Sequence, residues 1–523
     1  MKPKDFMKIE RAASLSRSEV GRLGTAVLFI VAVMIFTGTK FSGVDQLYLL
    51  VAAAVIGAYM AINIGANDVA NNVGPAVGSF AISLTGAIII AAIFEAAGAI
   101  IAGGDVVATI KKGIIDPANV ADPDVFVWVM MGALMGAALW LNAATWLGAP
   151  VSTTHSIVGG VAGAGIAAAG WDIVNWDSMA KIAFSWVASP VTGGLIAALF
   201  LYSLKRLVFF KDDPLSAAQK VVPAMIAIMA WAFTSYIALK GIKKIVKIDF
   251  PTAIMAGLVV ALLAYILVKP MIARAVPALE NTREGVSRLF TIPLILSAAL
   301  LSFAHGANDV ANAVGPLAGI VDVLTAGDGG AKVAIPLWVM VIGALGISIG
   351  LALFGPKLIR TVGTEITELD RSRAFCVALA AAITVIIASQ LGMPISSTHV
   401  ALGAVFGVGF LREFLEQRLG RVIEDVMQHH KDDPNFDQVE QVLMQFQNAP
   451  SDDKKRILAQ LRKMGSEAVI DAAERKVLQK ALKRQLVKRS ALLKIVSAWI
   501  ITVPVSAFLA ALFYFVLRGM MLP

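Results

Sequence analysis

The chain has 523 residues, of which 58% are hydrophobic and only 15% charged, and its mean hydropathy is +0.77. Soluble proteins carry about 25% charged residues, so this composition excludes an ordinary soluble domain. Many apolar runs reach the roughly 18–20 residues needed to cross a bilayer. The sequence therefore predicts a polytopic membrane protein, whose net charge of +9 reflects basic cytoplasmic loops and not nucleic-acid binding.

Residues 1–23 are too long and too charged for an ordinary cleaved signal peptide, and they predict a polar lead-in to an uncleaved first span. The apolar runs predict spans near 24–41, 46–64, 83–103, 125–147, 179–203, 216–238, 250–268, 290–305, 335–355, 374–391 and 494–517. Two further segments, 152–170, which is rich in Gly and Ala, and 395–410, begin at the Ser/Thr/His motifs. Counting them, the sequence predicts an all-α protein of about 12–13 membrane segments, some broken or re-entrant. The single cysteine, Cys376, lies in an apolar run and excludes an intrachain disulfide.

Two motifs occur twice in this chain. Residues 65–75 read GANDVANNVGP and residues 306–316 read GANDVANAVGP, so ten of eleven positions agree at an offset of 241. GAPVSTTHSIVGG begins at Gly148 and GMPISSTHVALGA begins at Gly392, an offset of 244. The same order and nearly the same spacing indicate an internal duplication. Polar, Gly- and Pro-bearing sequence inside paired hydrophobic segments is typical of a transporter's binding site.

The charges of the loops predict how the two copies are oriented. If the N-terminus lies inside and every apolar segment crosses once, loop 104–124 lies outside and its counterpart 356–373 lies inside. The inner loop carries Lys357, Arg360, Arg371 and Arg373, as the excess of positive charge on the inside requires. Equivalent loops on opposite sides indicate inverted-topology repeats. The Lys-rich loop 240–247 comes out external, so either it is an exception or one short segment is re-entrant.

We predict six parts, which are a lead and first span (1–45), a first membrane repeat (46–203), linking spans (204–289), a second membrane repeat (290–410), a cytoplasmic helical domain (411–490) and a last span completing the second repeat (491–523). The domain 411–490 holds 16 basic and 13 acidic residues, and its apolar residues recur at helical spacing. It is either a solvated spacer or a regulatory, partner-binding element.

The first duplicated motif predicts a cation site. Its candidate ligands are Asn67, Asp68, Asn71, Asn308, Asp309 and Asn312. A carboxylate at membrane depth costs at least ~2.5–3.5 kcal/mol, which makes two chance placements implausible. Carboxylate and amide oxygens are hard ligands that suit alkali cations, and Gly65, Gly74 and Pro75 could interrupt the helix to free backbone carbonyls. The alternative is hydrogen bonding between helices in a Gly-packed interface.

The second duplicated motif predicts an anion site. Its hydroxyl residues are Ser152, Thr153, Thr154, Ser396, Ser397 and Thr398, and each triplet precedes an apolar helical segment. An open helix N-terminus offers backbone N–H groups and partial positive charge, and hydroxyl groups add donors for a tetrahedral oxyanion such as phosphate or sulfate. Simple N-capping is the alternative, and it uses the same groups.

Three further residues are candidates for coupling. His155 and His399 follow the hydroxyl triplets, and either could donate to the anion or accept a proton; a structural histidine bonded to a backbone carbonyl is the alternative. Glu95 stands alone in an apolar run, where a glutamate is a candidate cation ligand or proton carrier.

The four motifs resemble those of the inorganic phosphate transporter (PiT) family, and the resemblance covers residues 46–410 and the last span. It implies a secondary transporter that imports phosphate with a cation, as a homodimer in the plasma membrane (the inner membrane of a Gram-negative cell). It implies phosphate at the Ser/Thr triplets and cations at the Asn/Asp motifs, with no other cofactor and no enzymatic activity. The GANDVAN form is closer to sodium-coupled than to proton-coupled members. Asn72 is matched by Ala313, so the two cation half-sites are unequal.

Other functions remain open at this point. Sulfate uptake and proton-coupled uptake of a metal–phosphate complex use the same residue types. An anion channel would use the same motifs to conduct the anion without coupling its movement to that of a cation. A membrane-embedded phosphate sensor would signal through residues 411–490.

Overall fold

The computed structural model describes residues 3–521 except 117–119, 121, 150, 243–245, 247, 327–334, 366–368, 416–417, 432–434, 449–455, 459, 462–469 and 483–488. These residues form two compact units, one of residues 1–407 with 490–523 and one of residues 408–489. Regular structure in the described part of the chain is helical, with one isolated β-bridge between Ile115 and Val174. The fold class predicted from the sequence is confirmed.

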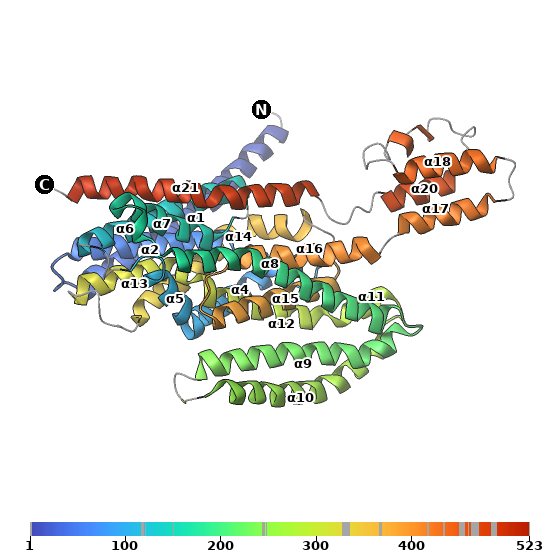
Figure 1. Cartoon of the computed structure of the whole chain (residues 1–523), viewed down its shortest axis with the longest axis horizontal. Coiled ribbons are helices and arrows are strands. Elements are labelled where there is room, and N and C mark those ends of the chain that lie inside the picture. The colour runs from blue at the N-terminus through green and yellow to red at the C-terminus, as the bar shows by residue number, and fades with distance from the viewer. Residues whose placement is uncertain are drawn as a thin grey trace. The chain divides into compact units, whose positions relative to one another are not determined.

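The first repeat follows an N-terminal helix, α1 (Pro3–Lys40). Its helices are α2 (Leu47–Asn67), α3 (Ala70–Gly78), α4 (Leu84–Ala102), α5 (Gly104–Lys112), α6 (Pro123–Leu147), α7 (Thr153–Ala169) and α8 (Trp176–Leu204). A π-helical turn, Lys205–Phe209, leads from α8 to the linking helices α9 (Pro214–Lys240) and α10 (Phe250–Ala275), which lie side by side (Figure 1). The short helix α5 lies inside the stretch 104–124, which the sequence predicted to be a loop.

The second repeat follows a short helix, α11 (Arg283–Leu289), which ends the linking region. It contains α12 (Thr291–Asp309), α13 (Ala311–Ala326), α14 (Leu337–Glu365), α15 (Arg371–Gln390) and α16 (Ser397–Leu415), and α21 (Arg489–Met521) is the last helix. Eleven helical segments of the described chain are long and apolar enough to cross a membrane. Helices α7 and α16, which start at the Ser/Thr triplets, are not among the eleven; counting them gives thirteen membrane segments.

The two repeats interlock through close helix crossings. Helix α2 packs on α14, and α4 packs on α12. A Cβ atom at Gly65 would overlap the backbone carbonyl of Ile347, and one at Gly306 would overlap the carbonyl of Glu95. Small residues allow such close approach of helix backbones in membranes. Gly65 and Gly306 are equivalent in the duplication, so the same contact is built twice.

A test of this packing is the replacement of Gly98, on α4, by alanine. A Cβ there would overlap the carbonyl of Phe303, and overpacking of this kind costs about 1–3 kcal/mol. We expect a lower thermal unfolding temperature in detergent. Gly24→Ala in α1 is the matched control, because no atom lies within 4 Å of its added Cβ and alanine is the better helix former. Equal unfolding temperatures for the two variants would contradict the packing role.

Polar contacts show which loops share a side of the membrane unit. Lys240, at the end of α9, forms an ion pair with Asp105 of α5. Gln46, before α2, donates to Asp124 at 3.2 Å. The start of loop 240–247 therefore lies on the same side as loop 104–124, as the count of crossings predicted; Lys243, Lys244 and Lys247 lie outside the described residues.

The loops predicted to be cytoplasmic also meet one another. Arg371 donates to the backbone carbonyl of Phe80 at 3.4 Å, and Asp370 forms ion pairs with Arg283 at 3.7 Å and Arg373 at 3.1 Å. Burial raises the pKa of Asp370, but Arg373, a hydroxyl and a backbone amide lower it by more, so its pKa lies below the usual value. The carboxyl stays ionised and anchors the start of α15.

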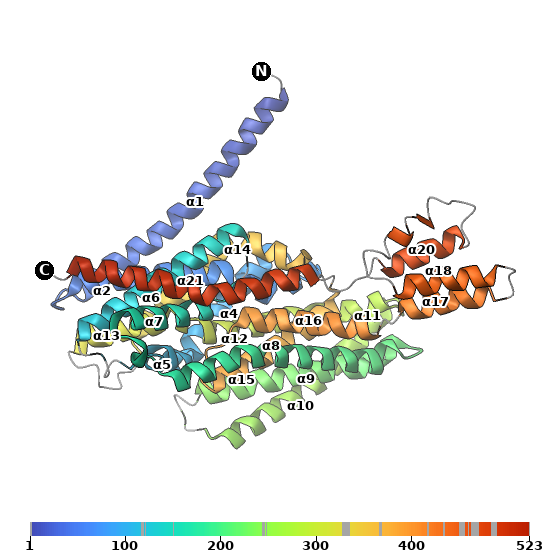
Figure 2. The same cartoon turned by 45° about the horizontal axis from the view of Figure 1, so that its top comes forward.

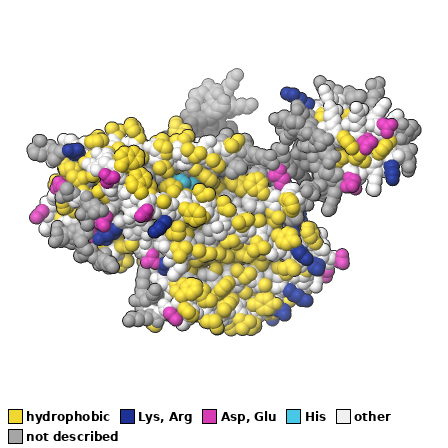
Figure 3. Space-filling view, viewed as in Figure 1, with side chains coloured by type: hydrophobic (Ala, Val, Ile, Leu, Met, Phe, Trp, Pro, Cys, Tyr) yellow, Lys and Arg dark blue, Asp and Glu magenta, His cyan; other side chains and the backbone are white. Residues whose placement is uncertain are grey.

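The surface of the membrane unit is apolar. Figure 3 shows a broad hydrophobic face on this unit, with most charged side chains toward its two ends. Exposed apolar residues of α10 include Met255, Leu258, Leu262 and Ile266, and Figure 2 shows this helix at the edge of the unit. A soluble protein would bury such a face, whereas a bilayer solvates it.

The second unit has a hydrophobic core of its own. Helices α17 (Arg418–His429), α18 (Phe436–Asn448) and α20 (Ala472–Leu482) surround buried residues that include Val439, Leu443 and Phe446. Asp471 and Glu474 form a reciprocal capping box at the start of α20, with bonds of 2.6 and 3.2 Å.

Candidate functional site

The duplicated GANDVAN motifs lie where two membrane helices break. Helix α2 ends at Asn67 and α3 begins at Ala70; α12 ends at Asp309 and α13 begins at Ala311. At the first break the backbone N–H of Asn71 donates to the backbone carbonyl of Asp68 at 3.0 Å, so the bond reaches three residues back instead of the four of an α-helix. The sequence placed the interruption at Gly65, Gly74 or Pro75, which was wrong: Pro75 lies inside α3, and Gly65 serves close packing.

The hydroxyl triplets begin helices α7 and α16, as predicted. Ser152 is the N-cap of α7 and accepts a hydrogen bond from the amide of His155 at 3.1 Å. Ser396 accepts from the amide of His399 at 3.2 Å in the same way. The two serine oxygens are therefore used as caps.

Three of the four remaining hydroxyl groups reach the two carboxylates, whereas Thr154 donates to the backbone carbonyl of Ile395 at 2.8 Å. Thr153 donates to Oδ2 of Asp68 at 2.6 Å, and Thr398 donates to Oδ1 of the same carboxylate at 2.8 Å. Ser397 donates to Oδ2 of Asp309 at 2.9 Å. All these side chains are at most 1% exposed. Each motif pair thus contributes to one network, in which hydroxyl donors from both repeats converge on the carboxylates.

Two equivalent asparagines connect this network. Asn71 donates to Thr398 at 2.8 Å, and Asn312 donates to Thr153 at 3.0 Å and to Thr154 at 3.1 Å. The side-chain oxygens of Asn71 and Asn312, and Oδ1 of Asp309, accept no hydrogen bond within the described part of the chain. Buried oxygens without donors are unfavourable, and a hard cation would satisfy them.

Asn67 and Asn308 brace the loops that lead to the Ser/Thr triplets. Asn67 accepts from the amide of Val151 at 3.1 Å and donates to the carbonyl of Ala149 at 3.2 Å. Asn308 donates to the carbonyl of Met393 at 3.1 Å, the position equivalent to Ala149. These two amides therefore position the loops before the Ser/Thr triplets, whereas the sequence proposed them as cation ligands. Oδ1 of Asn308 has no donor among the described residues.

One polar chain breaks the symmetry between the repeats. Glu95 accepts from Asn72 at 2.8 Å and lies 2.6 Å from Nδ1 of His305, whose Nε2 lies 3.2 Å from Oδ2 of Asp309. All these groups are buried. The duplication places Ala313, Ile347 and Ile64 at the positions of Asn72, Glu95 and His305.

His305 was missed by the sequence reasoning. The signal was the change from IGANDVAN to HGANDVAN, which puts a histidine four residues before Asp309 on one helix face. Ligand atoms of Asp68, His305 and Asp309 lie within 4.8 Å of one another. The two GANDVAN motifs therefore meet in the interior, as the duplication predicted.

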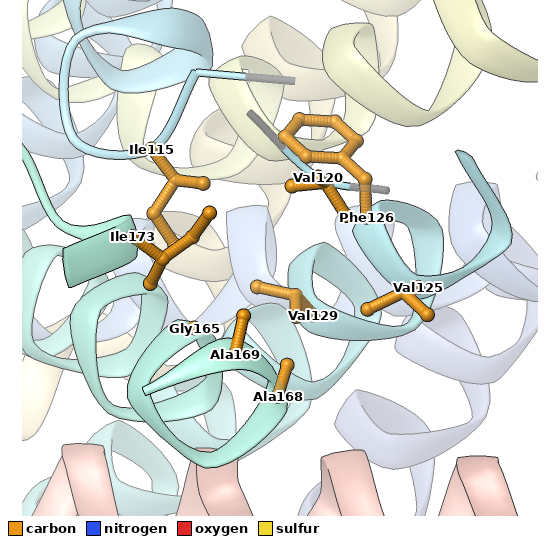
Figure 4. A pocket seen from close by; sticks show the side chains of 9 residues that line it. All are labelled: Ile115, Val120, Val125, Phe126, Val129, Gly165, Ala168, Ala169 and Ile173. Atoms are coloured by element: carbon orange, nitrogen blue, oxygen red, sulfur yellow. The ribbon is translucent and has the colours of Figure 1, made fainter. Parts of the chain in front are cut away.

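His155 and His399 do not reach the carboxylates. Their rings pack against each other, with centroids 4.4 Å apart, and against tryptophans. A small cavity elsewhere, between α6 and α7, is lined by apolar residues such as Ile115, Phe126 and Ile173 (Figure 4). It offers no donors and does not suit an anion.

A helical membrane protein with interlocked repeats and a buried, oxygen-rich site at two helix breaks has the architecture of a solute transporter. The model of the phosphate transporter family matches residues 64–510, so the chain belongs to that family. The protein is thus a multi-pass membrane protein that transports phosphate, and the family is one of permeases and not of enzymes.

Individual relatives agree with this assignment. The chain is 48% identical over 524 residues to a "Putative phosphate permease" of Helicobacter pylori (strain J99), covering 98% of each chain. A protein of similar description from Pyrococcus abyssi is 42% identical over 365 residues, covering 69% of this chain and 89% of its own. A solved structure of a sodium-dependent phosphate transporter is similar with a TM-score of 0.72 and 33% identity, covering 91% of this chain and 100% of that one.

Proposed function

We propose that the protein imports inorganic phosphate together with sodium, by alternating access to the site between the two repeats. The observation that carries the proposal is that Thr153 and Thr398, from opposite Ser/Thr motifs, both donate to the Asp68 carboxylate. Candidate anion ligands and candidate cation ligands are thus hydrogen-bonded to each other. Binding of either ion changes the partners available to the other, which is the physical basis of coupling.

The hydroxyl protons point at carboxylates in this network, whereas phosphate accepts hydrogen bonds and needs those protons. A sodium ion bound to the carboxylate of Asp68 or Asp309 supplies the positive charge that the hydroxyl hydrogens supply in its absence. The hydroxyl groups of Thr153, Ser397 and Thr398 can then turn toward the anion at little cost. Asn71 and Asn312 supply neutral oxygen ligands to the same cation through their acceptor-free side-chain oxygens.

Phosphate carries a charge between −1 and −2 near neutral pH, because its second pKa lies close to neutral, somewhat above the value of about 6 for phosphate esters. The four motifs contain no Lys or Arg. The N-termini of α7 and α16 contribute at most ~2 kcal/mol each when partly buried. Co-bound sodium therefore has to supply most of the positive charge. The structural neighbour is a sodium-dependent phosphate transporter, and this likeness supports sodium over a proton.

The loops before the two triplets are held from opposite sides of the membrane unit, which supports alternating access. Thr109 of α5 donates to the carbonyl of Gly392 at 2.7 Å, and Lys240 donates to that of Gln390 at 3.3 Å. Lys357 of α14 donates to the carbonyl of Trp146 at 3.4 Å. Trp146 and Gln390 are equivalent in the duplication, so release of one loop or the other would open the site to one side.

The direct test is flux. Purified protein in liposomes should take up labelled phosphate when sodium is higher outside, and much less when sodium is equal on both sides or replaced by choline. Uptake driven equally well by a proton gradient alone would contradict sodium coupling. Rapid uptake without any gradient of a coupling ion, at channel rates, would contradict a transporter. The homodimer implied by the resemblance stays a prediction.

Valine in place of Thr154 or Thr398 should weaken phosphate binding. Valine keeps the shape of threonine and removes the hydroxyl, which leaves an anion oxygen short of a donor at about 1–3 kcal/mol. We expect the phosphate half-saturation concentration to rise roughly five- to 150-fold, with a smaller change in that of sodium. Thr192→Val in α8, an exposed threonine bonded only to its own helix, is the control. Unchanged phosphate half-saturation in both site variants would refute the anion assignment.

A further inference from the structure

Four aromatic rings lie in a row behind the Ser/Thr motifs. Trp186 of α8 packs on His155 of α7, with centroids 3.8 Å apart and planes at 35°. His155 meets His399 of α16 edge-on at 4.4 Å, and His399 stacks on Trp499 of α21 at 3.6 Å and 29°. The row contains one histidine and one tryptophan from each repeat. We call it the ring stack.

The ring stack is anchored in the first turns of α7 and α16. Each histidine lies three residues after its cap, and its own amide closes the capping bond to Ser152 or Ser396. The residues just before the histidines, Thr154 and Thr398, belong to the candidate anion site. A displacement of either imidazole therefore moves a helix N-terminus and its hydroxyl group together.

The tryptophans come from helices that pack on the opposite repeat. Helix α8 lies against α16, where a Cβ at Gly403 would overlap the carbonyl of Pro190. Helix α21 lies against α7, where a Cβ at Gly163 would fall 2.5 Å from the carbonyl of Ala507. Trp186 also donates to the carbonyl of Pro394, in the loop before the second triplet, at 3.4 Å. Trp186 thus contacts both Ser/Thr motifs, and the ring of Trp499 contacts the second motif from a helix that packs on α7.

The histidines are surrounded by rings and not by ions. His155 is 6% exposed and His399 is 1% exposed. Within the described residues, Nε2 of His399 has no hydrogen-bond partner, and the polar neighbour of His155 is the backbone of Trp499. Contacts through ring faces and edges surround both imidazoles, and aromatic pairs at these distances attract each other beyond simple burial.

We propose that Trp186 and Trp499 are positioning residues of the anion site. Their rings pack on the outer faces of His155 and His399 and hold the two imidazoles in contact. This contact fixes the distance between the N-termini of α7 and α16. The proposal rests on the proposed phosphate function and adds residues outside the motifs to it. An anion held between two helix starts loses affinity when their spacing is free to vary, because the site must then be ordered on binding.

The test compares single and double variants in liposomes. Trp186→Leu or Trp499→Leu should raise the phosphate half-saturation concentration about five- to tenfold, the value of one aromatic pair, with the maximal rate within about twofold of the parent. Trp186→Phe, which keeps a flat ring, should recover most of the affinity. Trp171→Leu, at an exposed tryptophan stacked on Trp176, is the matched control and should behave as the parent.

The double variant decides whether the row acts as one unit. The rings of Trp186 and Trp499 lie at opposite ends of the row and stack on different histidines, so independent packing effects of the two side chains would multiply. The proposal predicts that the phosphate half-saturation concentration of the double variant is no higher than that of the more strongly affected single variant. Either change alone already removes the constraint on the two histidines. Multiplying effects, or a fall in maximal rate at unchanged half-saturation, would overturn it. Absence of sodium-dependent uptake in the parent protein would instead reject the proposed function itself.

Discussion

Asparagine in place of Asp68 or Asp309 is expected to abolish sodium-driven phosphate uptake while the protein still inserts and folds. The amide keeps the shape, and its single oxygen can accept one of the two hydroxyl bonds that Thr153 and Thr398 now make to Asp68, while its NH2 group can donate to the other hydroxyl oxygen. It lacks the charge that offsets the dehydration of a cation. Loss of one partner of a buried ion pair costs about 3–5 kcal/mol, so uptake should fall by more than about 100-fold.

The measurement is labelled uptake in liposomes under an inward sodium gradient, normalised to folded protein. Asp249→Asn is the matched control, because this aspartate is exposed and caps the start of α10, a role that asparagine fills as well. We expect parental uptake from the control. Normal gradient-driven uptake by either site variant would reject the two aspartates as cation ligands.

The second large effect should come from the polar chain that exists in one half-site only. Glu95→Ile removes the acceptor of both Asn72 and His305, which leaves two buried donors without a partner. Each buried donor without a partner lowers the free energy of unfolding by about 1–3 kcal/mol. We expect a marked loss of thermal stability and of uptake, although Glu95 lies outside both duplicated motifs.

The duplication supplies a rescue for this change. The triple variant Asn72→Ala, Glu95→Ile and His305→Ile copies the apolar residues of the other half-site. Replacing a buried polar cluster by apolar residues of similar volume is often neutral or stabilising, so the unfolding temperature should return toward that of the parent. If the Asn72–Glu95–His305 contacts serve coupling, phosphate uptake by the stable triple variant should remain low, and its dependence on sodium concentration should change. Full recovery of parental uptake would assign Glu95 a purely structural role.

The duplication made the centre of the molecule predictable. A polar motif repeated in the membrane interior of two inverted repeats predicted that its copies meet near the axis that relates them, and Asp68 and Asp309 do lie close together. The capping role of Ser152 and Ser396 followed as well, because serine before an apolar helical run is a strong N-cap signal.

Other features depended on contacts that spacing does not encode. The helix break falls at Asp68 and not at Pro75, because tertiary packing overrides the local preference of proline. His305 is a single change in an apolar run, and its meaning appears only when α4 brings Glu95 against it. The ring stack joins Trp186 and Trp499, which lie more than 300 positions apart in the sequence.

The central claim is that sodium and phosphate bind to one hydrogen-bonded network and need each other. The most direct test is equilibrium binding of phosphate to the purified protein by calorimetry, in sodium buffer and in choline buffer of equal ionic strength. The account predicts clear phosphate binding in sodium and nearly none in choline, with the sodium effect lost in Asp68→Asn. Tight phosphate binding in choline, equal to that in sodium, would contradict it.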